Sequence, residues 1–359
     1  MTKSFSILIP TYNEHDNISP LVERIAAAIP GKDYEVVFVD DDSRDGTSEL
    51  INSLALKYPV RVVVRKDKKG LASAVVDGFG LVSTETIVVM DADLQHPPEV
   101  IPDLIKAIQD GANIAVASRY VPGGGTEGWS KTRKVISSGA IALAHLLLPQ
   151  SRKVKDPMSG FFAFTKSTIS EITLEPIGYK ILLEMLVVGK AAKVSEVPFQ
   201  FQLRQQGESK LDASQEIEYL RHLFSLMRRS GELLRFGKFA LVGASGIIVN
   251  EGLLWLLHGN AGLSLLLASV IGIEASIITN FVLNNRFTFA DRRGKGVKSH
   301  FKRLGQFNLV SLGAVVINIG LLWLFKTKFG VHYLIANLIG IAVSMLWNYF
   351  ANNWWTWKK

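Results

Sequence analysis

Acidic and amide side chains are concentrated in three short stretches of the amino-terminal half of the chain. The stretches are Pro10-Thr11-Tyr12-Asn13-Glu14, Asp40 to Gly46, and Asp91-Ala92-Asp93-Leu94-Gln95-His96. Alternation along an extended chain puts Asp91 and Asp93 on the same side. Two carboxylates with a nearby amide suit a hard divalent cation such as Mg²⁺ or Mn²⁺, which in turn attracts phosphate oxygens. Each stretch alone reads equally well as an ordinary turn, so a site is predicted only if the three lie together.

Each stretch follows an apolar run that predicts a buried β-strand. The expected strands, at 4–10, 35–40, 60–65, 86–91 and 114–118, alternate with expected helices at 18–29, 46–57, 71–81 and 98–109. Strands of unbroken Val and Ile that alternate with helices indicate a mostly parallel sheet covered on both faces. Ligands of such sheets bind beyond the carboxyl ends of the strands. We therefore expect an α/β domain with the three polar stretches at one edge.

Composition excludes several kinds of chemistry. The chain has no Cys, which rules out disulfides, thiolate metal sites and a cysteine nucleophile. It lacks a phosphate loop of the Gly-x-x-x-x-Gly-Lys type and a glycine fingerprint at the first turn, which disfavours a kinase or a dehydrogenase. The net charge of +8 suits an anionic membrane surface or nucleic acid. Because no basic motif is interleaved with aromatic residues, we predict no nucleic-acid partner.

The carboxy-terminal third differs sharply in hydropathy. Mean hydropathy of the chain is +0.22 although 20% of its residues are charged. Four apolar runs account for this, at about 236–257, 263–283, 306–325 and 333–350. Each is close to the ~20 residues that a helix needs to cross a bilayer. We expect a soluble domain over 1–229 and a four-helix transmembrane domain over 230–359.

Basic residues predict the orientation of these helices. Six lie between the second and third runs and four lie at the approach to the first, whereas the two opposite connections carry none and two. The positive-inside rule then puts both termini and the soluble domain in the cytoplasm, in a multi-pass protein of the cell membrane.

The membrane half also contains a repeat. Residues 239–289 match 307–357 at a constant offset of 68, with 20 identities in 51 positions. Such a match indicates a duplicated helical hairpin. Glu251 and Glu274 break the repeat, since Ile319 and Ala342 occupy the equivalent positions. A carboxyl group at such depth is either a functional group or a packing contact bonded to Asn.

The ordered motifs of the first domain resemble those of family 2 glycosyltransferases, and most closely of polyprenol-phosphate (dolichol-phosphate) mannose synthases. The resemblance covers residues 4–227 and is carried by Pro10–Glu14, Val39–Asp45, Lys69-Gly70-Leu71, Asp91–Pro98, Ser118–Tyr120, Asp156–Phe162 and Gly207–Lys210. The second domain resembles the GtrA-like four-helix domain fused to some microbial members. The resemblance implies a GT-A fold and inverting transfer of mannose from GDP-mannose to a membrane polyprenyl (dolichyl) phosphate.

The resemblance also implies roles for individual residues. Pro10, Tyr12, Glu14 and Asp41 are expected around the guanosine, with Asp42 near the ribose. Asp91 is expected to face the nucleotide and sugar, while Asp93 and Gln95 hold Mg²⁺ or Mn²⁺ on the diphosphate. Lys210 is expected on the donor side, and Arg119, Arg133, Ser137 and Arg204 at the acceptor phosphate. Asp91, Asp93 and Arg119 are the expected catalytic residues.

The chemistry of this reaction agrees with the residues available. A phosphate nucleophile is already ionised at pH 7, so no strong general base is needed. The enzyme must stabilise charge on the departing diphosphate, for which a divalent ion is suited, and must position two anions, for which Arg is suited.

The lipid acceptor keeps its phosphate at the membrane surface. The apolar stretch 140–148, which follows the basic residues Arg133 and Lys134, is accordingly expected to lie in the bilayer interface. The stretch 177–188 fits either the interface or a core helix of the domain. No obligate protein partner is predicted.

Two alternatives stay open at this point. A related enzyme that makes polyprenyl-phosphate glucose from UDP-glucose shares most of these motifs. From a different class, the membrane half could be a flippase or transporter of the lipid-linked sugar, for which Glu251 and Glu274 would be candidate residues.

Overall fold

The computed structural model describes residues 3–66, 70–175, 177–178, 180–203, 213–294 and 296–358. The chain divides into two compact units, Met1–Ser230 and Gly231–Lys359. Each unit is described by itself.

The first unit is built on one large mixed sheet. Within the described residues its strands, in spatial order, are β3 (Val60–Val64), β2 (Tyr34–Asp40), β1 (Phe5–Thr11), β4 (Thr86–Val89), β7 (Phe162–Thr165), β5 (Ile114–Ser118) and β8 (Val194–Pro198). All neighbours are parallel except that β7 runs antiparallel to β4 and β5. Two short strands, β6 (Gly125–Thr126) and β9 (Gln200–Phe201), pair separately. The predicted α/β fold with a mostly parallel sheet is confirmed.

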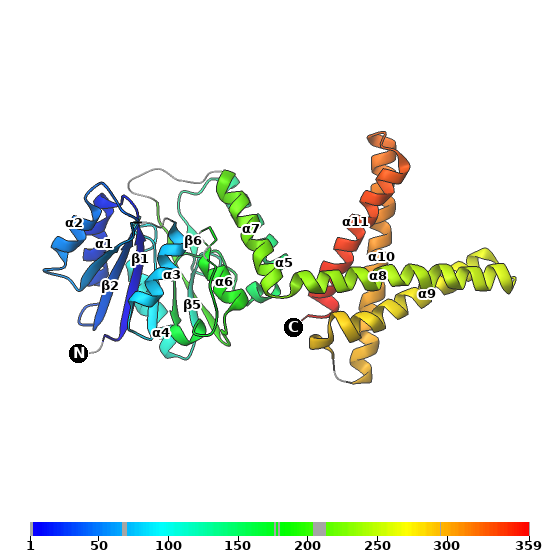
Figure 1. Ribbon diagram of the computed structural model, residues 1–359, viewed down its shortest axis with the longest axis horizontal. Coiled ribbons are helices and arrows are strands. Elements are labelled where there is room, and N and C mark those ends of the chain that lie inside the picture. The colour runs from blue at the N-terminus through cyan, green and yellow to red at the C-terminus, as the bar shows by residue number, and fades with distance from the viewer. Residues whose placement is uncertain are drawn as a thin grey trace. The chain divides into compact units, whose positions relative to one another are not determined.

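Helices cover both faces of this sheet (Figure 1). On one face, α1 (His15–Ala28), α2 (Thr47–Leu54) and α4 (Ile101–Gln109), which follows the short helix η1 (Pro98–Val100), contribute to the core that contains Ile7 and Ile9. On the other face, α3 (Leu71–Leu81) and α6 (Ile181–Val188) pack over Leu8. Successive residues of β1 thus enter opposite cores, which is why the strand is apolar at almost every position.

A third apolar cluster joins α6 to α5 (Lys131–Leu147) and α7 (Ala213–Arg229), and it includes Leu148 just before the turn η2 (Pro149–Lys153). Residues Ile181–Val187 of α6 are buried in the protein, so an interfacial position is wrong for this part of 177–188. Within 140–148, Ile141, Ala144 and Leu148 are buried, whereas Ala142 is exposed and the other side chains are half-buried. The interfacial position of 140–148 therefore stays a prediction. Exposed apolar side chains of α5 and α7 include Val135, Ile136, Ile217, Leu220 and Phe224.

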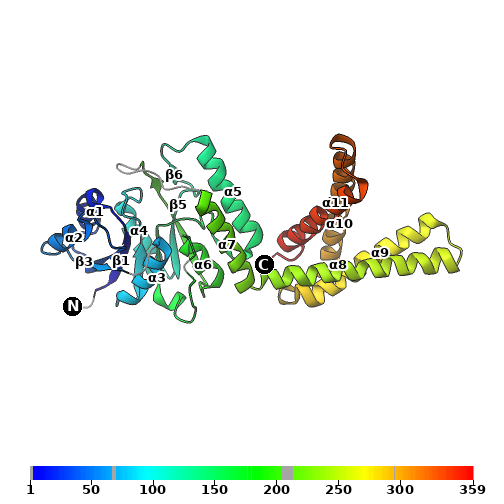
Figure 2. The same ribbon diagram turned by 45° about the horizontal axis from the view of Figure 1, so that its top comes forward.

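The second unit contains, in the described part of the chain, four helices long and apolar enough to cross a membrane. They are α8 (Glu232–Leu254, continued by the π-helical turn η4, Trp255–Asn260), α9 (Leu265–Leu283, continued by η5, Asn284–Thr288), α10 (Val297–Lys328) and α11 (Tyr333–Ala351, continued by η7, Asn352–Thr356). A short turn, η6 (Ala290–Arg292), follows η5. As Figure 2 shows, α8 lies beside α9 and α10 beside α11, so each pair is a hairpin.

The two hairpins share contacts at the offset of the sequence repeat. Ser276 Oγ donates to the carbonyl of Gly246, and Ser344 Oγ donates to that of Ala314, both at 2.8 Å. Thr288 and Thr356 likewise donate to the side chains of Asn284 and Asn352 at 2.7 and 2.6 Å. The repeated serines therefore join the two helices of each hairpin, and the repeated threonines bond within the turns η5 and η7 that continue α9 and α11.

The two carboxylates that break the repeat both accept hydrogen bonds from Asn. Asn308 Nδ2 donates to Glu274 Oε1 at 3.0 Å, and Asn250 Nδ2 donates to Glu251 Oε1 at 3.1 Å. Both carboxylates thus make the hydrogen bond to Asn that belongs to one of the two interpretations left open by the sequence.

Candidate functional site

The first two polar stretches meet because β1 and β2 are parallel and in register to their ends. Thr11 pairs with Asp40, and its Oγ1 donates to the Asp40 carboxylate at 3.1 Å. Beyond the strands, Asn13 N donates to Ser43 Oγ at 2.8 Å. The third stretch follows β4, which pairs with the other side of β1. All three stretches thus lie at the carboxyl edge of the sheet.

Asp40 and Asp42 have different environments. Asp40 is fully buried, and it accepts hydrogen bonds from Ser43 N and Oγ and from Ser48 Oγ. It therefore holds the loop rather than facing a ligand. Asp42 is half-buried in the left-handed region with φ 59°, a conformation that Asp tolerates.

Asp41 is buried in an ion-pair cluster. Its Oδ1 accepts from Arg65 Nε at 2.8 Å, and its Oδ2 accepts from the backbone N–H of Gly70 at 2.7 Å. Arg65 also donates to Asp77 and Ser73, both at 3.0 Å. The carboxylate expected at the guanosine thus fixes the start of α3, and Arg65, which the sequence did not single out, neutralises it.

Three other residues were expected around the guanosine. Tyr12 lies at the open rim with 40% of its side chain exposed. Pro10 is the buried penultimate residue of β1, and Glu14 precedes α1, where its carboxylate accepts from Asn17 Nδ2 at 2.7 Å.

The stretch that follows β4 forms a tight loop. Asp93 Oδ1 accepts from the backbone N–H of Gln95 at 3.1 Å, and Leu94 has a left-handed φ of 61°. Gln95 Nε2 donates to the carbonyl of Gln202 at 3.1 Å, which fixes the orientation of its amide. Asp91 and Gln95 line the same cavity.

The side chain of His96 is buried against this loop and hydrogen-bonded to its backbone. Its Nδ1 accepts from the backbone N–H of Asp91 at 3.1 Å, and its ring stacks on Phe161 with centroids 5.3 Å apart. Burial lowers the pKa of His96 to about 4, and the nearby Asp93 charge opposes this only in part. The imidazole is therefore neutral at pH 7. A Cβ on the adjacent Gly160 would lie 3.2 Å from Asp91 Oδ2 and from His96 Cε1, so a larger residue there would require one of these neighbours to shift by a few tenths of an ångström.

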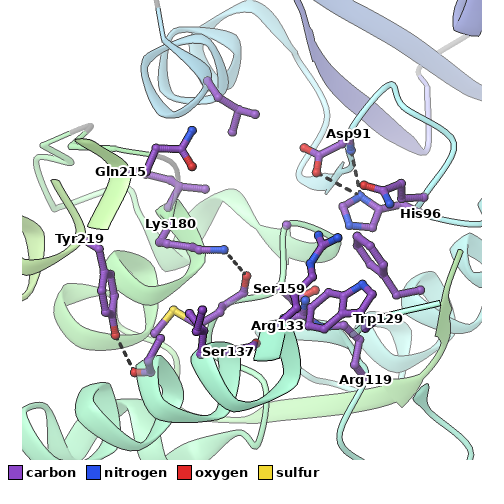
Figure 3. A pocket seen from close by; sticks show the side chains of 18 of the residues that line it. Asp91, His96, Arg119, Trp129, Arg133, Ser137, Ser159, Lys180, Gln215 and Tyr219 are labelled. Atoms are coloured by element: carbon purple, nitrogen blue, oxygen red, sulfur yellow. Dashed lines mark hydrogen bonds and ion pairs between the residues drawn. The ribbon is translucent and has the colours of Figure 1, made fainter. Parts of the chain in front are cut away.

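A cavity of about 700 Å³ extends from Asp91 to α5 and α7 (Figure 3). This is within the usual range for small-molecule sites. One end carries Asp91, Gln95 and His96. Arg119, Arg133 and Lys180 add positive charge, and the remaining wall is largely apolar, with Ile136 and Tyr219 among its residues. One chamber thus offers a place for charged groups and a place for an apolar chain.

Arg119 is held by a fully buried carboxylate. Its Nε and Nη2 donate to the two oxygens of Asp156 at 2.7 Å each, and its backbone N–H donates at 3.0 Å. Burial alone would lower the pKa of Arg119, but the hydrogen bonds and charge of Asp156 outweigh it and raise the pKa. The guanidinium also lies 5.3 Å from the ring of Trp129.

Arg133 and Ser137 project from the first turns of α5. Ser130 caps this helix by accepting from Arg133 N at 3.2 Å. The Arg133 guanidinium lies 4.3 Å from the Trp129 ring, and Ser137 Oγ is 2.9 Å from Tyr120 Oη. The structure brings Arg119, Arg133 and Ser137 into one cavity wall. Arg204, Lys210 and the motif residue Lys69 lie outside the described residues.

Lys180 is a cavity residue that sequence reasoning missed. It precedes α6, and its Nζ donates to the carbonyl of Met158 at 3.1 Å. Burial, and then repulsion from Arg119, lowers the pKa of Lys180 to about 8. The sequence signal was a Lys in front of the run 181–188, which is apolar except for Glu184 and is therefore an unusual place for a charge.

The acidic loop has oxygen donors that suit Mg²⁺ or Mn²⁺. Among the described residues, no group of three or more His, Asp and Glu side chains is placed to hold a metal ion. The loop nevertheless offers the carboxylates of Asp91 and Asp93 and the amide of Gln95 as oxygen donors within five residues, of which Asp91 and Gln95 line the cavity and Asp93 does not. Such a set fits an ion that shares its coordination with phosphate oxygens and water.

Comparison with known proteins agrees with this architecture. Residues 6–173 match the model of glycosyl transferase family 2, and residues 238–357 match the transmembrane domain of the GtrA/DPMS type. Glucosyl-3-phosphoglycerate synthase from Mycobacterium tuberculosis superposes with a TM-score of 0.51 at 17% identity, over 64% of this chain and 80% of that chain. The predicted GT-A fold is thereby confirmed, and the chain is a family 2 glycosyl transferase with a multi-pass membrane domain.

Three relatives with higher sequence identity define the family of this chain more narrowly. A dolichol-phosphate mannosyltransferase from Pyrococcus furiosus is 50% identical over 98% of this chain and 99% of its own length. The dolichol-phosphate mannosyltransferase of Saccharomyces cerevisiae is 40% identical over 63% of this chain and 88% of its own length. A polyprenol monophosphomannose synthase from Mycolicibacterium smegmatis is 37% identical over 59% of this chain and 83% of its own length. The chain belongs to the dolichol-phosphate mannosyltransferase family.

Proposed function

We propose that this chain transfers mannose from GDP-mannose to dolichyl or another polyprenyl phosphate and releases GDP. The product is polyprenyl-phosphate β-mannose, formed with inversion at the anomeric carbon. The observation that carries the proposal is the match to the P. furiosus mannosyltransferase, which spans both units of the chain. The single cavity that joins an acidic loop to a basic, partly apolar wall supports it.

The acidic loop is proposed to receive the donor. Tyr12 at the rim, with Pro10, Glu14 and Asp42 nearby, borders the place for guanosine, and Asp41 supports it through Arg65 and Gly70. Asp91, Asp93 and Gln95 would hold Mg²⁺ or Mn²⁺ against the diphosphate. The ion would stabilise the negative charge that develops on the leaving GDP. Solved relatives of this fold contain Mn²⁺ with a nucleotide, which supports this choice.

The basic wall is proposed to receive the acceptor phosphate. Arg119, oriented by Asp156, and Arg133 with Ser137 present hydrogen-bond donors into the cavity. An oxygen of that phosphate forms the new bond to C1 of mannose. The bond from C1 to the diphosphate oxygen breaks, and its electron pair leaves with GDP. Because the attacking oxygen is already ionised, no proton has to move.

An assay of the full chain across donors tests the function. Purified protein in detergent is given dolichyl phosphate with either GDP-mannose or UDP-glucose, with and without a chelator of divalent ions. We expect a mannolipid from GDP-mannose, loss of product with chelator, and recovery when Mg²⁺ or Mn²⁺ is restored. Glucolipid from UDP-glucose without mannolipid from GDP-mannose would refute the mannose assignment. Undiminished product in chelator would refute the metal assignment.

The cytoplasmic placement of both termini is also a proposal, and the absence of native Cys makes it testable. Single cysteines at Gly262 and at Lys298 would lie in connections that the positive-inside rule puts on opposite sides of the membrane. A membrane-impermeant thiol reagent added to intact cells should label Cys at position 262 and spare that at 298. The reverse pattern would overturn the orientation.

A further inference from the structure

Tyr120 contacts two of the groups proposed for the acceptor phosphate, although it does not itself line the cavity. It follows β5 and packs against the third apolar cluster, which contains residues of α5 and α7. Its Oη lies 2.9 Å from Ser137 Oγ, and the centre of its ring lies 5.6 Å from the guanidinium carbon of Arg119. Ser137 and Arg119 both line the cavity (Figure 3). Tyr120 can therefore act on a ligand through these two neighbours.

The hydrogen bond between the two hydroxyl groups has a favoured direction. Ser137 has one hydroxyl proton to donate and two lone pairs that can accept. The phenol of Tyr120 is more acidic than an aliphatic hydroxyl, so it is the better donor and the Ser137 oxygen is the better acceptor. In this direction Tyr120 Oη donates to Ser137 Oγ across the 2.9 Å between them. The proton of Ser137 is then left for a group in the cavity.

The contact with Tyr120 also takes Ser137 away from a competing partner. Ser137 lies inside α5, four residues after Arg133. A serine inside a helix commonly donates its proton to the carbonyl four residues earlier, which here would leave no proton for a ligand. In the described part of the chain, Ser137 Oγ is instead hydrogen-bonded to Tyr120. The side chain is thus held from outside the helix, in the wall of the cavity.

We propose that Tyr120 positions the Ser137 hydroxyl for the phosphate of the lipid acceptor, so that Ser137 accepts from Tyr120 while it donates to a phosphate oxygen. The inference rests on the proposed function and deepens it by naming a positioning residue for the acceptor. A hydrogen bond accepted from Tyr120 polarises the Ser137 O–H and strengthens its bond to the anion. A phosphate in the cavity could also belong to the donor diphosphate, and separate KM values for the two substrates distinguish these sources.

The test is a double-mutant cycle of Tyr120→Phe and Ser137→Ala in the full-length protein. Phenylalanine keeps the ring beside Arg119 and removes only the hydroxyl. Tyr120→Phe should raise the KM for dolichyl phosphate about 3- to 10-fold, the usual effect of one hydrogen bond between uncharged groups. Ser137→Ala should raise it on the order of 10- to 100-fold, because a hydrogen bond to a charged group is lost.

The double variant distinguishes positioning from a general effect on the fold. Without Ser137, the Tyr120 hydroxyl has no route to the phosphate, so the double variant should be no worse than Ser137→Ala. The KM for GDP-mannose should stay within about threefold of wild type in all three variants, since a neutral hydrogen bond near the acceptor is the only donor-independent contact removed.

Two controls match the two substitutions. Tyr58→Phe also removes the hydroxyl of a half-buried tyrosine, but Tyr58 packs against the core that contains Ile7 and does not line the cavity. Ser138→Ala removes the exposed hydroxyl of the next residue of α5, which does not line the cavity either. Both controls should keep the wild-type KM values, and thermal unfolding verifies that every variant is folded.

The outcomes separate this inference from the proposed function. If wild-type protein makes no mannolipid, the proposed function fails and the inference fails with it. If wild-type protein is active and Tyr120→Phe retains the wild-type KM for dolichyl phosphate, the inference fails alone. Losses that multiply in the double variant would show that Tyr120 acts by another route, and would overturn it. A rise confined to the KM for GDP-mannose would assign the pair to the donor diphosphate and overturn it as well.

Discussion

Asp156→Asn tests whether a buried carboxylate controls Arg119. Asp156 is fully buried and accepts three hydrogen bonds from Arg119, two of them at 2.7 Å and one at 3.0 Å. Asparagine has the same shape but no charge, and its NH₂ group must replace one of the two accepting oxygens. The Arg119 guanidinium, with 8% of its side chain exposed, would then lose its counter-charge.

The cost follows from the burial of the pair. Removing one partner of a buried ion pair costs about 3–5 kcal/mol, and the oxygen that Asn retains puts this change near ~3 kcal/mol. Each 1.4 kcal/mol is a factor of ten, so the fraction of molecules with Arg119 correctly placed should fall roughly 100-fold. We therefore expect kcat/KM for dolichyl phosphate to fall by about that factor, with the KM for GDP-mannose within about threefold of wild type.

A double-mutant cycle makes the reasoning refutable. Mannolipid formation is measured for Asp156→Asn, Arg119→Met and the double variant, with Asp103→Asn on the exposed side of α4 as the control. If Asp156 acts through Arg119, the double variant should be no worse than Arg119→Met. If the activity losses of the two single variants multiply in the double variant, Asp156 does not act by positioning Arg119. The same conclusion follows if the activity of Asp156→Asn stays within threefold of wild type.

Three further predictions concern the acidic loop and the stability of the fold. Asp93→Asn should abolish transfer while thermal unfolding stays near wild type, and wild-type rates at saturating Mn²⁺ would contradict its role. Gly160→Ala should reduce kcat at least 10-fold by displacing Asp91, since its Cβ would lie 3.2 Å from Asp91 Oδ2, whereas Gly139→Ala, with open space around it, should not. His222 is buried with its pKa lowered to about 4, against ~6.5 when unfolded, so its share of stability is complete above pH 6.5 and declines as pH falls toward 4. About 2 kcal/mol of the free energy of unfolding should be lost at pH 5. His222→Asn should therefore show a smaller drop in melting temperature between pH 7 and pH 5 than the wild type does. An equal drop in both proteins would show that another group causes the loss of stability in acid.

The sheet could be predicted where local sequence determines it. Unbroken Val and Ile in β1 and β2 reflect burial on both faces, so strand type and parallel pairing followed directly. The antiparallel β7 was not predicted. Its four residues follow a motif loop, and nothing local shows that the chain inserts there between β4 and β5. The burial of α6 could not be decided for a related reason, since an apolar run too short to span a membrane suits an interface or a core equally well.

The same distinction applies to the candidate site. The acidic loop was predictable because residues that follow neighbouring parallel strands must share one edge of the sheet. The cations were harder to place. Arg65 meets Asp41 from 24 residues away, and Arg119 meets Asp156 from 37 residues away, so sequence spacing does not reveal either pair. Lys180 lines the cavity from the position just before α6, in a stretch that the sequence left as either interfacial or buried.

Charge explains why one cavity contains both an acidic loop and a basic wall. The proposed reaction brings a phosphate monoester up to a sugar that still carries a diphosphate. Two unit negative charges about 5 Å apart repel each other by roughly 3 kcal/mol at an effective dielectric constant of 20, and these groups carry more than one charge each. A metal ion on the donor side neutralises only one of the two anions. In the proposed function, Arg119 and Arg133 would supply the cations for the other, and the Asp156 pair keeps Arg119 in place before an acceptor arrives. On that proposal the basic wall would be as necessary to transfer as the carboxylates proposed to hold the metal.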